Sequence, residues 1–284
     1  MHVEQASPVA IEIPVKRSPG LPEPPPWLIA GLAAAYLLAL AALAFLPGAT
    51  LVQRLSILDG GVCNQLVEHT YFPAGQQLPL CARCTGMYMG FAATTLWMWG
   101  TGRLHAASFP GRGVALILGL AVVVMGVDGF NSLFTDLHLP HLYQPQNTLR
   151  IATGLGTGVA MAAFIIPVAN TLLWRSEDTR SSFATPRQLA ALLPVLLLMF
   201  VGGVSQAAFL LYPIALLSSA GLVLAFSLVN LVFVLGIGNR VGRFITWRQL
   251  FPVYTVVVIL AVIELLALYV LKTTTMHALS LSAA

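Results

Sequence analysis

All three cysteines of the 284-residue chain lie in one stretch, residues 63–90, with the sequence CNQLVEHTYFPAGQQLPLCARCTGMYMG. Cys81 and Cys84 form a Cys-x-x-Cys pair, and Cys63 precedes it by about 18 residues. This spacing supports three kinds of chemistry. Outside the cytoplasm, where thiols are oxidised, Cys63 could form a disulfide with either partner. The three thiolates could instead bind a metal ion, or the Cys-x-x-Cys pair could take part in thiol exchange.

Two of these alternatives draw on a neighbouring side chain. A divalent metal ion would take the thiolates of Cys63, Cys81 and Cys84 with one imidazole, for which His69 is the candidate, in a tetrahedral Cys3His site. Thiol exchange would benefit from Arg83 and from a helix N-terminus, because both lower the pKa of a nearby thiol. The sequence leaves the disulfide, metal and exchange interpretations open.

A carboxylate lies in the apolar run that ends at residues 125–132 (MGVDGFNS). An ionised Asp128 inside a membrane helix is costly unless it is paired or functional. We expect it about one turn from the outer boundary and paired with an arginine, either Arg150 at the same depth or Arg83. The alternative is a free carboxylate that carries protons. Asn131 would share the helix face of Asp128.

Further polar residues occur inside later apolar runs. Glu264 lies about 15 residues into the last run and is a candidate proton or ion relay, or else a protonated packing residue. Gln206 and Asn230 are expected to bond between helices. Gly154 and Gly158 have the spacing of a close helix–helix contact, which is favoured over dinucleotide binding because the run lies inside a membrane helix.

The elements that position these residues are membrane helices. The chain is 58% hydrophobic and only 8% charged, whereas soluble domains carry about 25% charged residues. Its long apolar runs match a hydrocarbon core of about 30 Å. We therefore expect an all-α, polytopic integral membrane bundle of about seven helices. The expected spans are residues 27–46, 84–100, 113–133, 149–174, 189–212, 214–237 and 250–271, with Tyr212-Pro213 joining the fifth to the sixth.

Basic residues predict the orientation of the bundle. With seven spans, ten lysines and arginines fall on the side of the N-terminus and four on the other. Short loops rich in these residues stay in the cytoplasm, so the N-terminus is expected inside and the C-terminus outside. The cysteine loop and residues 134–148 would then face outward. The four outer basic residues are Arg54, Arg83, Arg150 and Lys272.

Three segments are expected along the chain. Residues 1–26 form a proline-rich, disordered cytoplasmic tail, residues 27–174 a four-span half with the Cys, Asp and Arg residues, and residues 175–284 a three-span C-terminal half. The lipid bilayer is the expected partner, in a bacterial cytoplasmic membrane, together with other membrane subunits or a second copy of the chain. A net charge of only +4 on scattered residues predicts no nucleic-acid partner.

The cysteine segment resembles the signature of domain-of-unknown-function family 2085, a family of predicted integral membrane proteins. The resemblance covers about residues 60–160. It lies in residues 78–86 (LPLCARCTG), Tyr88, Gly90, Cys63, Gln65, Asp128, Gly129, Asn147, Arg150 and Gly154. The family carries no assigned activity, so the resemblance implies a membrane fold and adds Gln65 and Asn147 to the candidate site.

The chain departs from the family pattern at two places. Asn64 stands where members have histidine, and His69-Thr70 stand where members have arginine-serine. If the family histidine binds a metal, His69 would have to take that role in this chain.

We therefore expect one outward-facing polar site that binds or transports a small solute or a metal ion. The alternatives are a non-catalytic structural subunit of a larger membrane complex and a membrane thiol-redox or lipid-linked enzyme. No residue is assigned as catalytic, and the only cofactor expected is a divalent metal ion at the cysteines. The candidate site consists of Cys63, Gln65, Cys81, Arg83, Cys84, Asp128, Asn147 and Arg150.

Overall fold

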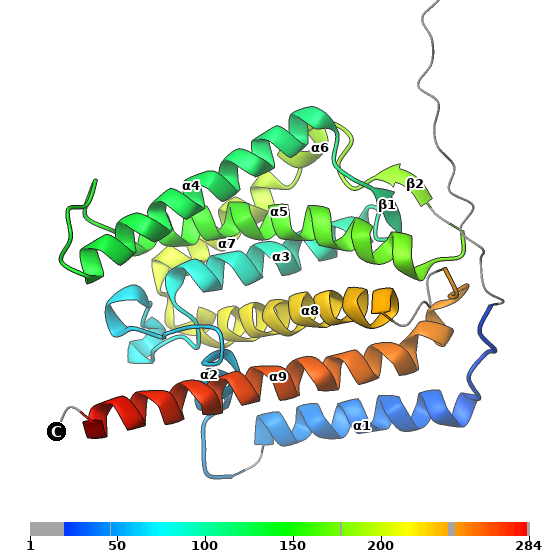
Figure 1. Cartoon of the computed structure of the whole chain (residues 1–284), viewed down its shortest axis with the longest axis horizontal. Coiled ribbons are helices and arrows are strands. Elements are labelled where there is room, and N and C mark those ends of the chain that lie inside the picture. Colours follow the sequence, from blue (N-terminus) through cyan, green and yellow to red (C-terminus); the bar gives the residue numbers. More distant parts are fainter. Residues whose placement is uncertain (1–19, 46, 177, 238–241, 283–284) are drawn as a thin grey trace, which may run out of the picture.

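The computed structural model describes residues 20–45, 47–176, 178–237 and 242–282. Long helices lie side by side in it (Figure 1). This confirms the all-α prediction, with one short two-stranded sheet in addition. The elements are α1 (Pro26–Phe45), α2 (Leu51–Asp59), the 3-10 turns η1 (Val67–His69) and η2 (Pro73–Gly75), α3 (Ala82–Gly100), β1 (Ala106–Ser108), α4 (Arg112–Asp136), α5 (Asn147–Leu173), β2 (Asp178–Ser181), α6 (Pro186–Ala190), α7 (Leu193–Ser205), η3 (Ala208–Leu210), α8 (Leu211–Ile237) and α9 (Trp247–Ser282).

Six helical segments in the described part of the chain are long and apolar enough to cross a membrane. They correspond to all the predicted spans except the second. They are Pro26–Phe45, Arg112–Asp136, Asn147–Leu173, Pro186–Ser205, Ala208–Ile237 and Trp247–Ala278. The predicted second span corresponds to α3, which is rich in small and polar residues and is not among the six. The count of seven spans therefore stays a prediction.

The connection between the fifth and sixth predicted spans lies earlier than expected. The prediction at Tyr212-Pro213 is wrong, because α7 ends at Ser205 and α8 begins at Leu211. Gln206 adopts a left-handed conformation (φ 50°) that ends α7. Pro213 falls in the first turn of α8, where its missing N–H removes no helical hydrogen bond.

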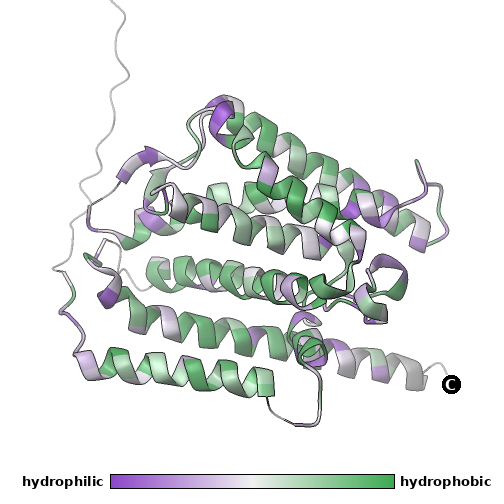
Figure 2. Cartoon of the chain, turned by 180° about the vertical axis from the view of Figure 1, so that it is seen from behind, coloured by the Kyte–Doolittle hydropathy of each residue, from purple (hydrophilic) through white to green (hydrophobic). Residues whose placement is uncertain are grey.

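Contacts between loops define two ends of the bundle. We call the end with strands β1 and β2 the β end, and the end with the loop that carries Cys63 the cysteine end. At the β end, β1 pairs with β2, Arg175 N donates to Phe244 O (2.9 Å), and Leu21 N donates to Arg243 O (3.3 Å). At the cysteine end, the loop after α2 meets the α7–α8 connection and the start of α5. Figure 2 shows hydrophilic residues gathered at these ends, with apolar helix surface between them.

The basic residues follow the two ends in the predicted pattern. Arg54, Arg83, Arg150 and Lys272 lie at the cysteine end. The β end carries Arg103, Arg112, Arg175, Arg180, Arg187, Arg243 and Arg248. Lys16, Arg17 and Arg240, with residues 1–19 of the predicted tail, lie outside the described residues. Which end faces the cytoplasm stays a prediction.

Helix α3 runs between the two ends through the centre of the protein, packed against α5 and α8 (Figure 1). Glycines bring the backbones together. A Cβ at Gly158 would lie under 3.0 Å from Met87 O, and one at Gly154 under 3.0 Å from Arg83 O. On the other side of α3, Gly221 of α8 lies equally close to Tyr88 O. The helix-packing interpretation of Gly154 and Gly158 is confirmed, and this contact fixes the N-terminus of α3.

Candidate functional site

Cys63 is positioned by a tight turn after α2. Its N–H donates to Asp59 O (3.2 Å). Gly61 lies so close to Leu265 O of α9 that a side chain there would clash. About two turns further along α9, Lys272 Nζ donates to Cys63 O (2.7 Å). The turn is therefore clamped against α9 at two points, and its thiol is buried.

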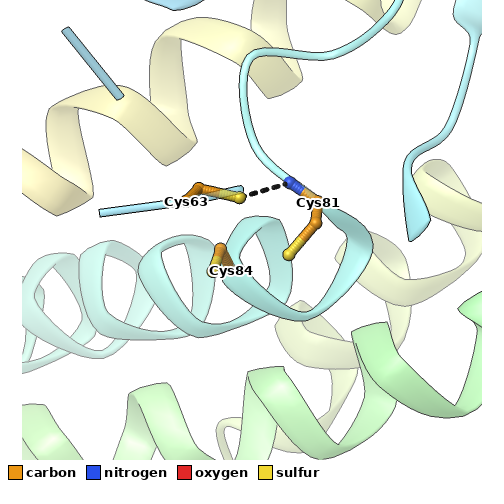
Figure 3. Close-up of side chains that lie close together, drawn as sticks. All are labelled: Cys63, Cys81 and Cys84. Carbon is orange, nitrogen blue, oxygen red and sulfur yellow. Dashed lines mark hydrogen bonds between the residues drawn. The ribbon is translucent and has the colours of Figure 1, made fainter. Parts of the chain in front are cut away.

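Cys81 and Cys84 reach the same place from the start of α3 (Figure 3). Cys81 is the N-cap residue, and residues three apart share a helix face, so Cys84 lies beside it. The sulfur atoms of Cys63, Cys81 and Cys84 all lie within 4.8 Å of one another. Cys63 Sγ accepts hydrogen bonds from Cys81 N (3.3 Å) and Gln65 N (3.4 Å). The structure thus brings together the three predicted thiols, none of them in a disulfide.

Gln65 closes the loop between these cysteines. Its side-chain amide donates to Ser56 O (2.8 Å) at the end of α2 and to Pro79 O (2.6 Å) just before α3. Its backbone has a positive φ of 53°, a left-handed conformation that turns the chain at this point. Gln65, which the family resemblance indicated, therefore positions the two cysteine-bearing segments relative to each other.

The thiols differ in their readiness to ionise. A hydrogen bond with Cys63 lowers the pKa of the Cys81 thiol well below its ordinary value. A hydrogen bond with Cys84 and the positive charge of Arg83 make smaller contributions in the same direction. The hydrogen bond to Cys81 raises the pKa of Cys63. The surroundings therefore favour the thiolate form at Cys81, which is the form that binds metals and attacks disulfides.

His69 does not join the cysteines. Its Nε2 lies 3.2 Å from Asp136 Oδ1 at the end of α4. Among the described residues, the metal-ligand cluster that includes cysteine consists of the three cysteines alone. The Cys3His set with His69 has no support from this geometry, while a three-sulfur set does.

Arg83 faces α4, away from the sulfur atoms. Its Nη2 donates to Asp128 Oδ2 (2.6 Å) and to Ser132 Oγ (3.0 Å). Asp128 is buried, and its second oxygen accepts from Tyr143 Oη (2.9 Å). The predicted Asp128–arginine pair is therefore present, with Arg83 as the partner.

Arg150 joins the same network without contacting Asp128. Its Nη2 donates to Ser132 Oγ (3.4 Å) and its Nη1 to Asn147 Oδ1 (2.8 Å). The Asn147 amide donates in turn to Glu68 O (3.1 Å) in the cysteine loop. Asn147 and Arg150 thereby connect the start of α5 to the segment that carries Cys63.

Sequence reasoning missed three residues of this region. Ser132 lies four residues after Asp128, so the helical period could have indicated it. Tyr143 comes from the α4–α5 loop, whose path follows from Asn131: its side chain accepts from Leu142 N (2.7 Å) and donates to Tyr143 O (2.8 Å). No local pattern indicates that path.

Asp59 is the third missed residue and is fully buried. One carboxylate oxygen accepts a hydrogen bond from Ser219 of α8, and the other has no partner among the described residues. Burial raises the pKa of Asp59 to about 7, while the bond from Ser219 acts against the rise. Asp59 is therefore a carboxyl that is half protonated near neutral pH, beside the turn that carries Cys63.

Glu264 lies apart from the cysteines. Asn230 Nδ2 of α8 donates to Glu264 Oε2 (3.1 Å), so the predicted interhelical role of Asn230 is confirmed. Gln206 also bonds between segments, accepting from Phe72 N (3.0 Å). An apolar cavity of about 250 Å³ lies between α3, α5, α8 and α9, and its lining includes Tyr254 but none of the site residues. The relay role of Glu264 stays a prediction.

Comparison with known proteins finds similarity over the part of the chain that carries the cysteines. The family described as predicted membrane protein (DUF2085) matches residues 63–164. An uncharacterized protein of Methanothermobacter thermautotrophicus is 32% identical over 101 residues, which cover 36% of this chain and 81% of the relative. An uncharacterized protein of Methanocaldococcus jannaschii is 25% identical over 114 residues, covering 40% of this chain and 67% of that relative. No solved structure shows significant similarity.

The matched region begins at Cys63 and includes the whole cysteine cluster and the network of Arg83, Asp128 and Arg150. Helices α6 to α9 lie outside it. On the strength of the family match and the similarity to the Methanothermobacter protein, this chain belongs to the DUF2085 family of predicted membrane proteins.

Proposed function

We propose that this multi-pass membrane protein binds a thiophilic metal ion such as Zn²⁺ at the cluster of Cys63, Cys81 and Cys84. The observation that carries the proposal is the approach of three sulfur atoms to within 4.8 Å of one another. Thiolates bind zinc at about 2.3 Å, and a tetrahedral arrangement then places the sulfurs about 3.8 Å apart. Small side-chain rotations would bring the cluster to that geometry.

The surrounding charges support binding of a metal by thiolates. Three thiolates and one divalent cation carry one excess negative charge. Lys272 supplies a cation whose Nζ lies against Cys63 O. The charge of the loaded cluster would therefore be offset by a nearby positive group, which a buried anionic centre requires.

Three protein ligands leave the fourth position of a tetrahedral ion to a ligand from outside the chain. Structural zinc sites are closed by four protein ligands, whereas sites that act on a ligand keep one position open. His69, the imidazole expected here, lies against Asp136. We therefore propose that the fourth ligand is water or a small solute, which suits a protein that binds or delivers an ion or solute.

The proposal places this site on the outer side of a cytoplasmic membrane. The excess of arginine at the β end supports that orientation. The two relatives named above are archaeal proteins, so they lend no support to a specifically bacterial membrane. A thiol reagent that cannot cross membranes would label the cysteines of intact cells, after removal of the metal, if the orientation is right.

The test measures metal and thiol content of the full-length protein in detergent. The protein is incubated with Zn²⁺, separated from free ion, and analysed for zinc per chain. Thiols are counted after unfolding in chelator, with and without reductant. We expect about one zinc per chain and three thiols without reductant. Cys84→Ser should bind almost no zinc, whereas the control Thr95→Ser, on the same helix, should bind as much as the wild type.

Two results would replace this proposal with one of its alternatives. Thiols that become countable only with reductant would indicate a disulfide, as expected of a structural subunit. Three free thiols with no zinc bound would favour thiol exchange, for which the lowered pKa of Cys81 is the supporting observation.

A further inference from the structure

At the cysteine end, the partly buried Arg83 and the buried Arg150 belong to a network that contains one carboxylate, that of Asp128. Asp128 pairs with Arg83, and no ion pair of Arg150 occurs among the described residues. Arg150 is only 4% exposed. Asp136, the carboxylate that ends α4, is already paired with His69 (3.2 Å). A buried charge is costly unless a counter-charge and hydrogen bonds offset it, so this network favours one further anion.

Both arginines of this network keep a hydrogen-bond donor that is unused among the described residues. The Nε atoms of both Arg83 and Arg150 are buried and have no acceptor among the described residues. Ser132 Oγ accepts from both guanidinium groups, at 3.0 and 3.4 Å, which leaves its own hydrogen free to donate. Two guanidinium N–H groups and one hydroxyl are the donors that an oxyanion requires.

The start of α5 adds to the positive potential. The helix begins at Asn147, so Arg150 lies in its first turn, and the N-cap residue Gln146 makes no side-chain cap hydrogen bond. The N-terminus of a helix carries partial positive charge and favours anions. The same end would therefore attract an anion even without the side chains, and the arginines make the attraction specific.

We propose that a phosphate-type oxyanion binds between Arg83 and Arg150, with Ser132 as a third donor. The planar guanidinium fork matches the oxygens of phosphate. The oxyanion would reach the site from the side of Arg83, because 22% of the Arg83 side chain is exposed. The oxyanion could be free phosphate or the phosphodiester of a lipid headgroup at the outer surface. This site is distinct from the metal site and does not depend on it.

The experiment measures thermal unfolding of the full-length protein in nonionic detergent. One arm titrates inorganic phosphate against chloride at matched ionic strength, and the other titrates a short-chain phosphatidylglycerol against a zwitterionic phosphatidylcholine. We expect a saturable rise of the unfolding temperature in at least one arm. Saturation with phosphate would assign a free oxyanion, and saturation with the anionic lipid alone would assign a headgroup.

Variants locate the site. Arg150→Gln should weaken the response at least about tenfold and Ser132→Ala about threefold. Arg180→Gln, at the β end and paired with Asp178, is the matched control and should respond as the wild type does. If Arg150→Gln fails to fold, the responses of Ser132→Ala and Arg150→Lys test whether the oxyanion binds at this site. Cys84→Ser should keep the full response, because the metal site is separate.

The proposal is overturned if neither arm saturates beyond its control. It is also overturned if the responses of Arg150→Gln or its substitute Arg150→Lys, and of Ser132→Ala, equal that of the wild type.

Discussion

The first turn of α3 presents two different groups of side chains on two of its faces, here called the sulfur side and the charged side. On the sulfur side, Cys81 and Cys84 face Cys63, whose N–H bonds the backbone carbonyl of the acid Asp59. On the charged side, Arg83 faces α4 and the acid Asp128. Successive residues of a helix point about 100° apart, so four consecutive residues, Cys-Ala-Arg-Cys, serve both sides.

The two buried acids show what this division means. Asp128 has an arginine and a tyrosine within hydrogen-bonding distance, so its charge is offset. Asp59 has only the hydroxyl of Ser219 and forms no ion pair among the described residues. An arginine therefore offsets the charge at Asp128 on the charged side, whereas burial favours the neutral form of Asp59 on the sulfur side. Helix α3 carries both environments, so substitutions can remove them together or one at a time.

The largest effect on folding is expected from a substitution that forces α3 away from α5. Gly158→Leu would drive a side chain into the backbone of α3 at Met87 and should abolish the folded protein, because backbone cannot give way as a flexible side chain does. Both sides would be lost together. Gly119→Leu, on α4 where nothing lies within 4 Å of the added Cβ, should express and unfold as the wild type does. Yield of monodisperse protein in detergent is the measurement.

Asp128→Asn should break the charged side and leave the sulfur side intact. It breaks a pair whose carboxylate is buried and leaves the partly buried Arg83 without its counter-charge, which costs up to about 3–5 kcal/mol. Zinc content of the folded fraction should remain near the wild-type value. Asp178→Asn, which breaks the exposed pair with Arg180, should leave the unfolding temperature unchanged. Equal effects of the two substitutions would contradict the buried-pair account.

Asp59→Asn should stabilise the protein at alkaline pH and not at acidic pH. The folded-state pKa of Asp59 is raised to about 7 from 3.8, so the folded protein holds this proton more tightly than the unfolded chain. The stability contributed by the neutral acid is complete below pH 3.8 and is lost as pH rises through about 7. At pH 8 the variant should gain up to roughly 4 kcal/mol, measured as unfolding temperature at pH 5 and 8. A gain of equal size at both values would show that protonation is not the cause.

Tyr143→Phe is expected to have the smallest effect on stability. It removes one hydrogen bond to Asp128 from a half-buried hydroxyl and should cost about 1 kcal/mol. Tyr212→Phe, on α8 with about half of the residue exposed, is the control and should cost nothing measurable. If Tyr143→Phe is as harmless as the control, the tyrosine does not help to hold the Asp128 charge.

Much of this arrangement could be predicted from residue types and spacing. Apolar length predicted the helices, and the Cys-x-x-Cys pair with Cys63 predicted the thiol cluster. The cost of burying a charge predicted a partner for Asp128. Each of these follows from a short segment or from one physical penalty that holds in any fold.

The remainder depended on tertiary contacts. Which arginine meets Asp128 is decided by the rotation of α3, which the glycines of α5 fix. The raised pKa of Asp59 requires α2 to lie against Ser219, 160 residues away. Low hydropathy at α3 is explained only when α5 and α8 are seen to surround it. No pattern within one segment carries that information.

The most direct test of the central claim is zinc K-edge X-ray absorption of the purified, zinc-loaded protein. The account predicts three sulfur neighbours at about 2.3 Å and one lighter neighbour at about 2.0–2.1 Å, with almost no bound zinc in Cys84→Ser. A spectrum of nitrogen and oxygen neighbours alone, unchanged by Cys84→Ser, would contradict it.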